Sequence, residues 1–191
     1  MKLDKTDILY GNFEKVFLHI CCAPDATYPF LYLRGRHYRV TGFFYNPNIH
    51  PLSEYEKRLE EVVRFSRAVH MDLEVGKYDK DSWFERIKGT ENEPEGGKRC
   101  YICYKMRLEE TVRIAKENGF DYFATTLSIS PHKNIKWIFD IGEQLGNKYG
   151  VKFIKADFKK RNGFKSSIVL SKYYKMYRQN YCGCVFSKVE K

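Results

Sequence analysis

The 191-residue sequence has no run of apolar residues that approaches the roughly 18 needed for a membrane-spanning helix. Its first fifteen residues, MKLDKTDILYGNFEK, also lack the apolar segment of a secretory signal peptide. Both absences predict a cytoplasmic protein without a membrane partner. Because cytoplasmic thiols are kept reduced, we do not expect the six cysteines to form structural disulfides.

Phosphate-binding glycine motifs are missing as well. The chain has neither GxxxxGK followed by Ser or Thr nor a GxGxxG after an expected strand, so a nucleotide cofactor is not expected. Internal repeats and low-complexity linkers are also missing. At 191 residues, with 43% hydrophobic and 16% aromatic residues, the chain is long enough for a sizeable core. We therefore predict a single domain over residues 1–191, with a basic and cysteine-containing C-terminal segment.

What the chain does have is cysteine in three close pairs: Cys21-Cys22, Cys100-Tyr-Ile-Cys103 and Cys182-Gly-Cys184. Soft metals, iron–sulfur clusters and dithiol redox reactions all require thiols at short spacing. The spacing predicts a metal or redox site without deciding between them. The CxxC pair at the start of an expected helix suits either zinc or a cluster, and a single buried cysteine acting as a small apolar residue is the alternative at the first pair.

The Cys182-Gly-Cys184 pair leaves three alternatives open. Gly183 permits a sharp turn, and a disulfide across so small a ring would be strained and easily reduced, which favours catalysis over stability. The two thiols could instead bind metal, or they could be incidental residues of a tail. Among the polar residues near expected strand ends, His132, Asp25 and Asp157 are candidate proton donors or ligands, although ordinary capping explains the two aspartates equally well.

The charge of the chain is strongly positive, at +10, which favours polyanionic partners. Residues 155–178 contain eight basic side chains against one acid. These are Lys155, Lys159, Lys160, Arg161, Lys165, Lys172, Lys175 and Arg178, with Tyr173, Tyr174, Tyr177 and Tyr181 among and after the last of them. Basic groups neutralise phosphates and aromatic rings stack on bases, so this segment predicts nucleic-acid binding. A solvated helix face is the equally weighted alternative.

The hydrophobic pattern predicts an α/β protein. Expected strands cover residues 16–21, 38–45, 73–75, 122–127 and 151–156, and expected helices cover 27–34, 53–70, 81–88, 100–118, 135–149 and 166–177. Ser53 and Glu56 predict a capping box at the second helix. The alternation predicts a parallel sheet with helices on both faces, in which ligands bind at the carboxyl ends of strands. Cys21-Cys22 and residues 128–134 both fall at such ends.

Five motifs together resemble the cobalamin-independent epoxyqueuosine reductases, the QueH family: LHICCAPD at 18–25, RCYICYKMR at 99–107, ATTLSISPHKN at 124–134, DF at 157–158 and RQNYCGC at 178–184. The resemblance implies a HUP-like fold, similar to the adenine-nucleotide α-hydrolases. It also implies reduction of epoxyqueuosine to queuosine in the anticodon loop of tRNA. A [4Fe–4S] cluster on Cys21, Cys22, Cys100 and Cys103 is expected, with Cys182 and Cys184 matching a redox-active pair.

Such a reaction needs two electrons and two protons, whereas a cluster passes one electron at a time. Either the Cys182/Cys184 dithiol supplies two electrons, or these thiols with Asp25 or Asp157 hold an additional iron ion as a Lewis acid. Candidate proton donors are His132, Tyr181 and Asp25. The electron donor is left open. The rival hypothesis is a zinc-stabilised nucleic-acid-binding protein without catalysis, which does not explain the CxC pair.

Overall fold

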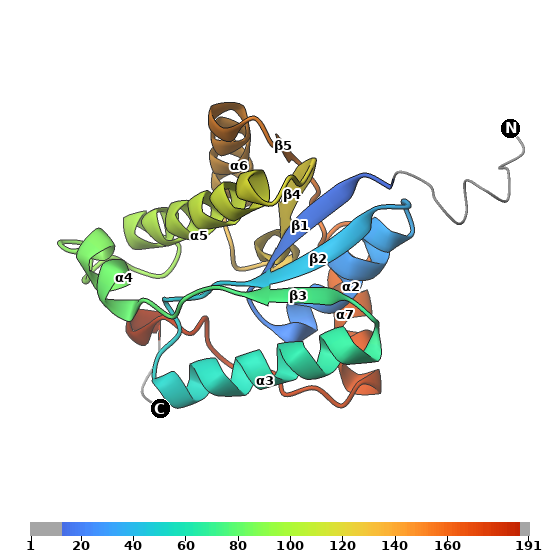
Figure 1. The fold of residues 1–191 in the computed structure, drawn as a ribbon. Helices are drawn as coiled ribbons and strands as arrows, with labels where there is room; N and C mark the ends of the chain where they lie inside the picture. Colours follow the sequence, from blue (N-terminus) through green and yellow to red (C-terminus); the bar gives the residue numbers. More distant parts are fainter. Residues whose placement is uncertain (1–12, 188–191) are drawn as a thin grey trace, which may run out of the picture.

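The computed structural model describes residues 13–187, which form a five-stranded parallel sheet in the order β3-β2-β1-β4-β5 (Figure 1). The strands are β1 (Lys15–Ile20), β2 (Arg39–Phe44), β3 (Asp72–Val75), β4 (Tyr122–Thr125) and β5 (Lys152–Phe153). β1 is central, and the chain runs outward from it first toward β3 and later toward β5. The order therefore reverses between β1 and β4, and the crevice at such a reversal is where ligands bind in open α/β sheets.

Helices cover both faces of the sheet (Figure 1). They are α2 (Ala23–Arg34), α3 (Leu52–Ala68), α4 (Lys80–Ile87), α5 (Lys98–Glu117), α6 (Ile135–Tyr149) and α7 (Gly163–Tyr173), with 3-10 turns η1 (Thr126–Ile129) and η2 (Val185–Ser187). α2, α3 and α7 pack on one face, and α4, α5 and α6 lie on the other. The predicted parallel sheet with helices on both faces is confirmed.

The period-two pattern of β1 explains its central place. Val16, Leu18 and Ile20 point into the core beneath α2 and α3, whereas Phe17 points into the core beneath α5 and α6. All are fully buried. A strand that is apolar on both faces is stable only between two helical layers, which is why this segment lies in the middle of the sheet.

Several predicted boundaries shift in the structure. The predicted capping box at Ser53 is wrong, because α3 begins at Leu52 after Pro51 and Ser53 lies inside its first turn. α2 begins at Ala23 rather than at residue 27, with Pro24 in its first turn, where a missing N–H costs nothing. β4 ends at Thr125, where the chain turns into η1.

The last strand and the last helix also differ from the prediction. β5 keeps only two residues of the predicted strand 151–156, because it is an edge strand and pairs with β4 alone. α7 begins at Gly163 and ends at Tyr173, and residues 174–184 continue as an irregular segment of turns and bends. This early end of α7 carries the CxC pair back toward the first cysteines.

Candidate functional site

The carboxyl ends of β1 and β4 are joined through a cysteine and a threonine. The backbone N–H of Cys21 donates to Oγ1 of Thr126 at 3.1 Å, and the same hydroxyl lies 3.2 Å from the Cys21 sulfur. Cys21 follows β1 and Thr126 opens η1 after β4, so this contact spans the reversal point of the sheet. The predicted placement of the first cysteine pair at a strand end is confirmed.

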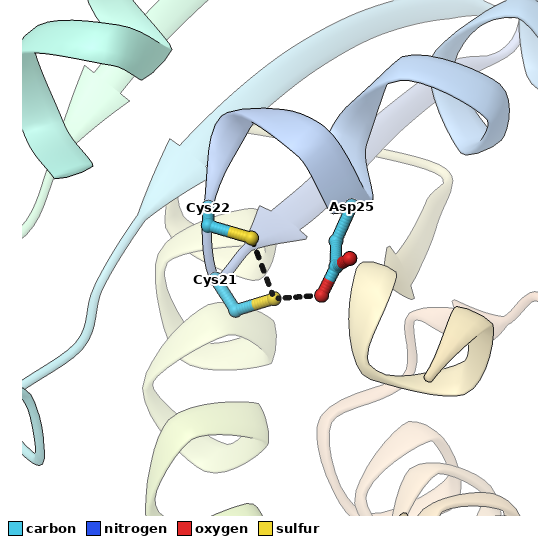
Figure 2. Close-up of side chains that lie close together, drawn as sticks. All are labelled: Cys21, Cys22 and Asp25. Atoms are coloured by element: carbon cyan, nitrogen blue, oxygen red, sulfur yellow. Dashed lines mark hydrogen bonds between the residues drawn. The ribbon is translucent and has the colours of Figure 1, made fainter. Parts of the chain in front are cut away.

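Three candidate ligand residues converge at this point (Figure 2). The sulfurs of Cys21 and Cys22 lie 4.0 Å apart, and Oδ2 of Asp25 lies 3.3 Å from the Cys21 sulfur. Cys22 caps α2 with extended backbone and Asp25 occupies the first helical turn, which lets both side chains turn back toward Cys21. Within residues 13–187, these three residues form the one group whose ligand atoms all lie within 4.8 Å of one another. Two thiols and a carboxylate are a donor set suited to a metal ion.

Cys100 and Cys103 lie in the first two turns of α5, on the same side of the sheet as Cys21 and Cys22. Cys21, Cys22, Cys103 and Cys184 belong to one continuous buried cluster, and Cys100 packs against it. The Cys100 sulfur accepts the backbone N–H of Gly96 at 3.2 Å. The helical thiols stay outside the tight group around Cys21, so the fold brings the two pairs into one core without bringing their sulfurs into contact.

The C-terminal pair is held over the same region by α3. Arg58, only 3% exposed, donates to the backbone carbonyls of Cys182 at 3.0 Å and Tyr181 at 3.2 Å, while its Nε pairs with Glu54 at 2.7 Å. The carbonyl of Gly183 accepts the backbone N–H of His50 at 2.8 Å. Gly183 has φ of +104°, a conformation that side chains disfavour, and a Cβ there would lie 2.9 Å from Ile49 Cγ1.

Polar side chains connect the C-terminal segment to the first cysteines. Nε2 of Gln179 donates to the Cys22 sulfur at 2.8 Å, and the ammonium of Lys133 lies 3.7 Å from the Cys182 sulfur. A cavity of about 390 Å³ opens between these groups. Its lining includes Cys21, Asp25, Arg107, His132, Lys133 and Cys182. Thiols from opposite ends of the chain thus face one space.

Burial and hydrogen bonding shift the pKa values of the two adjacent thiols in opposite directions. Hydrogen bonding with Cys22 lowers the pKa of Cys21, whereas burial raises the pKa of Cys22. Burial also raises the pKa of Cys100 and Cys103, and brings that of Cys184 to about 11. These groups share the cavity region with two cations, Arg107 and Lys133, whose charges favour the thiolate form.

The remaining predicted residues separate into two groups. His132 is exposed and lines the cavity, as Asp25 does. Asp157 lies outside the cavity lining and pairs with Lys159 at 2.9 Å. The Tyr181 hydroxyl donates to the carbonyl of His50.

The basic segment is largely exposed. Lys160, Arg161, Lys165, Lys172, Lys175 and Arg178 all present their side chains to solvent, while Lys159 is half-buried beside Asp157. Arg178 also lines the cavity and donates to Ser171 Oγ at 2.7 Å. Tyr173, which is 78% exposed, adds an open aromatic surface on α7. The segment therefore continues from the rim of the cavity onto α7.

Sequence reasoning missed four residues of the site: Lys133, Gln179, Arg58 and Arg107. Lys133, Gln179 and Arg107 stand inside three motifs of the family resemblance, at 124–134, 178–184 and 99–107, and this position was a usable signal. Arg58 lies in no such motif, and the sequence predicts burial of neither Arg58 nor Arg107, because an arginine on an amphipathic helix is expected to be exposed. Their burial is a property of the tertiary structure.

The fold and the site define a thiol-rich α/β protein built on an open parallel sheet. Two solved structures share the fold. A predicted subunit of a tRNA methyltransferase from Methanocaldococcus jannaschii aligns with a TM-score of 0.59 at 14% identity, covering 84% of this chain and 75% of that one. The U34-tRNA thiolase NcsA from Methanococcus maripaludis, solved with its [4Fe-4S] cluster, aligns with a TM-score of 0.60 at 14% identity, covering 93% and 62%. The predicted fold class is confirmed.

Sequence comparison gives the family. The model for epoxyqueuosine reductase QueH matches residues 16–190. Epoxyqueuosine reductase QueH from Thermotoga maritima is 41% identical over 179 residues, covering 92% of this chain and 91% of the relative. The protein of that name from Acinetobacter baylyi is 42% identical over 183 residues, covering 94% and 83%. This chain belongs to the QueH family of epoxyqueuosine reductases. No helix among the described residues is long and apolar enough to span a membrane.

Replacing Gly183 with alanine tests the seat of the CxC pair. The new methyl group would meet Ile49 and Arg58 and would force a residue with a side chain into positive φ, so the loop must leave its place. We expect Cys184, now 8% exposed, to react with iodoacetamide in metal-free protein at least ~10-fold faster, as an exposed thiol does. Peptide mass spectrometry measures this rate.

Gly89→Ala is the matched control, because that glycine also has positive φ but a Cβ there meets nothing within 4 Å. Equal labelling of Cys184 in wild-type protein and the Gly183→Ala variant would contradict the assignment of Gly183 and Arg58 as its clamp.

Proposed function

We propose that this protein reduces epoxyqueuosine to queuosine in tRNA, and that the cavity between Cys21 and Cys182 is its active site. Family membership supports the reaction. The observation that carries the site assignment is that thiols separated by some 160 positions in sequence line one cavity at the reversal point of the sheet. A purely structural zinc site explains neither this convergence nor the clamped CxC pair.

The reaction removes the epoxide oxygen as water and leaves an alkene, which consumes two electrons and two protons. Oxidation of the Cys182 and Cys184 thiols to a disulfide releases two electrons and two protons, so this pair balances one turnover. An external reductant, which must be an electron donor of the cell, then returns the disulfide to two thiols. Cys182 lines the cavity and Cys184 lies behind it in the core, which suits attack by the outer thiol and resolution by the inner one.

The cysteines of the first two pairs suit an iron–sulfur cluster. All six cysteines have free thiols, and thiolates are the ligands that such clusters require. Cys21, Cys22, Cys100 and Cys103 would hold a [4Fe–4S] cluster, which supplies single-electron transfer when bound. Gln179 would orient the Cys22 sulfur through its hydrogen bond, and Thr126 that of Cys21.

Three groups of the cavity supply charge and protons to the substrate. Burial lowers the pKa of Lys133, but the nearby Cys182, Tyr104 and Cys21 side chains raise it by more. Lys133 therefore keeps its proton. Its ammonium therefore stabilises negative charge on the Cys182 sulfur or on the leaving oxygen. His132 and Asp25 line the same cavity and are the candidate proton donors. The Tyr181 hydroxyl is committed to the His50 carbonyl, which makes it the weakest of the predicted donors.

An additional iron ion is the second hypothesis for activating the epoxide. Asp25 is the carboxylate available to it, because its oxygen lies beside the Cys21 sulfur in the cavity. Asp157, the other residue considered, lies away from the cavity against Lys159. An iron ion bound to Asp25 would polarise the epoxide carbon–oxygen bond as a Lewis acid.

Transfer RNA would approach along the exposed basic segment. Lys159, Lys160, Arg161, Lys165, Lys172, Lys175 and Arg178 run from α7 to the cavity rim, so phosphates bound there would lead a nucleoside into the cavity. A loop nucleoside can be splayed out of its stack, and Tyr173 offers an exposed ring for stacking. The cavity of about 390 Å³ is of the size that binds a small ligand group.

Iron and sulfide analysis of anaerobically purified protein tests the cofactor. We expect brown protein with iron and inorganic sulfide, and loss of both in Cys100→Ala and Cys103→Ala, because a cluster is held by its thiolates. Cys184→Ala, which alters a buried cysteine of the same core, should keep the cluster. Colourless protein containing zinc would refute the reductase and favour the zinc-stabilised nucleic-acid-binding hypothesis.

Turnover by Cys182→Ser tests the dithiol. A serine cannot form the disulfide, so we expect multiple-turnover conversion of epoxyqueuosine tRNA to fall by at least ~100-fold, as removal of a reacting group does. Nucleoside analysis of digested tRNA by mass spectrometry measures the conversion, with Val185→Ala as the neighbouring control. Full multiple-turnover activity of Cys182→Ser would exclude the redox role and leave the additional iron ion as the hypothesis.

Salt dependence of tRNA binding tests the basic segment. Each lysine that contacts a phosphate contributes about one unit to the slope of log affinity against log salt concentration. Lys165→Ala and Lys172→Ala should each weaken binding and reduce the slope by about one unit. Lys105→Ala, on the α5 side of the sheet, is the control and should change neither quantity. Filter binding at several salt concentrations measures both, and a salt-independent affinity would contradict the assignment.

A further inference from the structure

We propose that Arg107 is a built-in counter-cation for the thiolate-bound centre, and that its charge raises the reduction potential of that centre. The proposal rests on the proposed function, since it concerns the metal centre at the thiols of that site. Arg107 supplies no ligand atom and acts on the centre only through its positive charge. It is therefore a positioning residue rather than a catalytic one.

The guanidinium of Arg107 is buried without an anion to balance it. The side chain is 2% exposed, and among residues 13–187 no carboxylate forms an ion pair with it. One nitrogen, Nη2, donates to Oδ1 of Asn46 at 2.5 Å, and Nε has no hydrogen-bond partner. A cation removed from water in this way is costly unless an opposite charge accompanies it.

Two other buried arginines have more hydrogen-bond partners than Arg107 has. Arg58 pairs with the carboxylate of Glu54 at 2.7 Å and also donates to two carbonyls. Arg99, 1% exposed, also has an Nε without a partner, but its Nη1 donates to the carbonyls of Thr90, Glu91 and Glu93. Arg107, with a single amide partner, is the exception among the three.

The groups that face Arg107 with negative charge are thiols. The Cys21 and Cys182 thiols line the same cavity as Arg107, and Cys103 lies one helical turn before Arg107 on α5. They come from α5, from the end of β1 and from the C-terminal segment, which are three separate parts of the chain. Burial and the Arg107 charge lower the pKa of the neighbouring His19, so His19 adds no second positive charge there.

A centre held by four thiolates has a net negative charge, and one-electron reduction makes that charge larger. A fixed buried cation therefore stabilises the reduced form more than the oxidised form, which raises the reduction potential. The low dielectric of the core keeps this effect strong, because solvent does not screen a guanidinium that is 2% exposed. The bound centre in turn supplies the anion that Arg107 lacks.

The test compares Arg107→Met and Arg107→Lys with Arg113→Met, which removes one partly exposed positive charge from the same helix. Each protein is reconstituted with iron and sulfide, and its midpoint potential is measured without tRNA by redox titration with electron paramagnetic resonance detection. We expect a more negative potential in Arg107→Met, and values close to the wild type in Arg107→Lys and Arg113→Met. An unchanged potential in Arg107→Met, or an equal shift in Arg107→Lys, would overturn the proposal.

Thermal unfolding of the metal-free proteins supplies a second readout. Without the centre, Arg107→Met removes an uncompensated buried charge, so it should melt at or above the temperature of the wild type. A melting temperature well below that of both the wild type and Arg107→Lys would show that the cation is already satisfied by the protein, which contradicts the proposal. Failure of the wild type to take up iron would refute the cluster of the proposed function. The melting temperatures of the metal-free proteins would still test the proposal for Arg107.

Discussion

The site depends on the adjacency of two parallel strand ends, β1 and β4, at the point where the sheet reverses direction. Helices leave these two strands on opposite faces, so the ends stay uncovered and a crevice remains between them. The hydrogen bond from the backbone of Cys21 to Thr126 fixes the two ends to each other. The first cysteine pair, Asp25 and the strand-end loop after β4 all take their positions from this contact.

A second constraint comes from the other end of the chain. Residues 174–184, after α7, form no helix or strand, and α3 holds them through Arg58, which pairs with Glu54. Side chain to backbone contacts of this kind fix a loop without requiring a particular sequence in it, apart from the glycine at 183. The dithiol is thus placed by a helix more than a hundred positions earlier in the chain.

The first cysteine pair and the CxC pair both contribute a thiol to a cavity that positive side chains also line. Arg107 and Lys133 bring two cations to a region whose other polar groups are thiols and one carboxylate. In the metal-free protein the arrangement leaves a buried cation poorly satisfied, which is a cost in stability. Such a cost is typical of sites shaped for a bound group, because the group then supplies the missing interactions.

The sequence by itself determined the alternation of strands and helices and the position of Cys21, Cys22 and Asp25 at a strand end, because apolar periodicity and a strand-to-helix turn are local properties. Its limits are equally physical. The capping box at Ser53 failed because Pro51 is the N-cap and α3 begins at Leu52, and the strand at residues 151–156 shortened because edge strands lack a second partner. Only the tertiary structure decided that Lys133 lies beside Cys182, that Arg58 clamps the CxC pair and that Arg107 is buried near thiols. Each depends on which side chains distant segments bring together, and no local pattern encodes that.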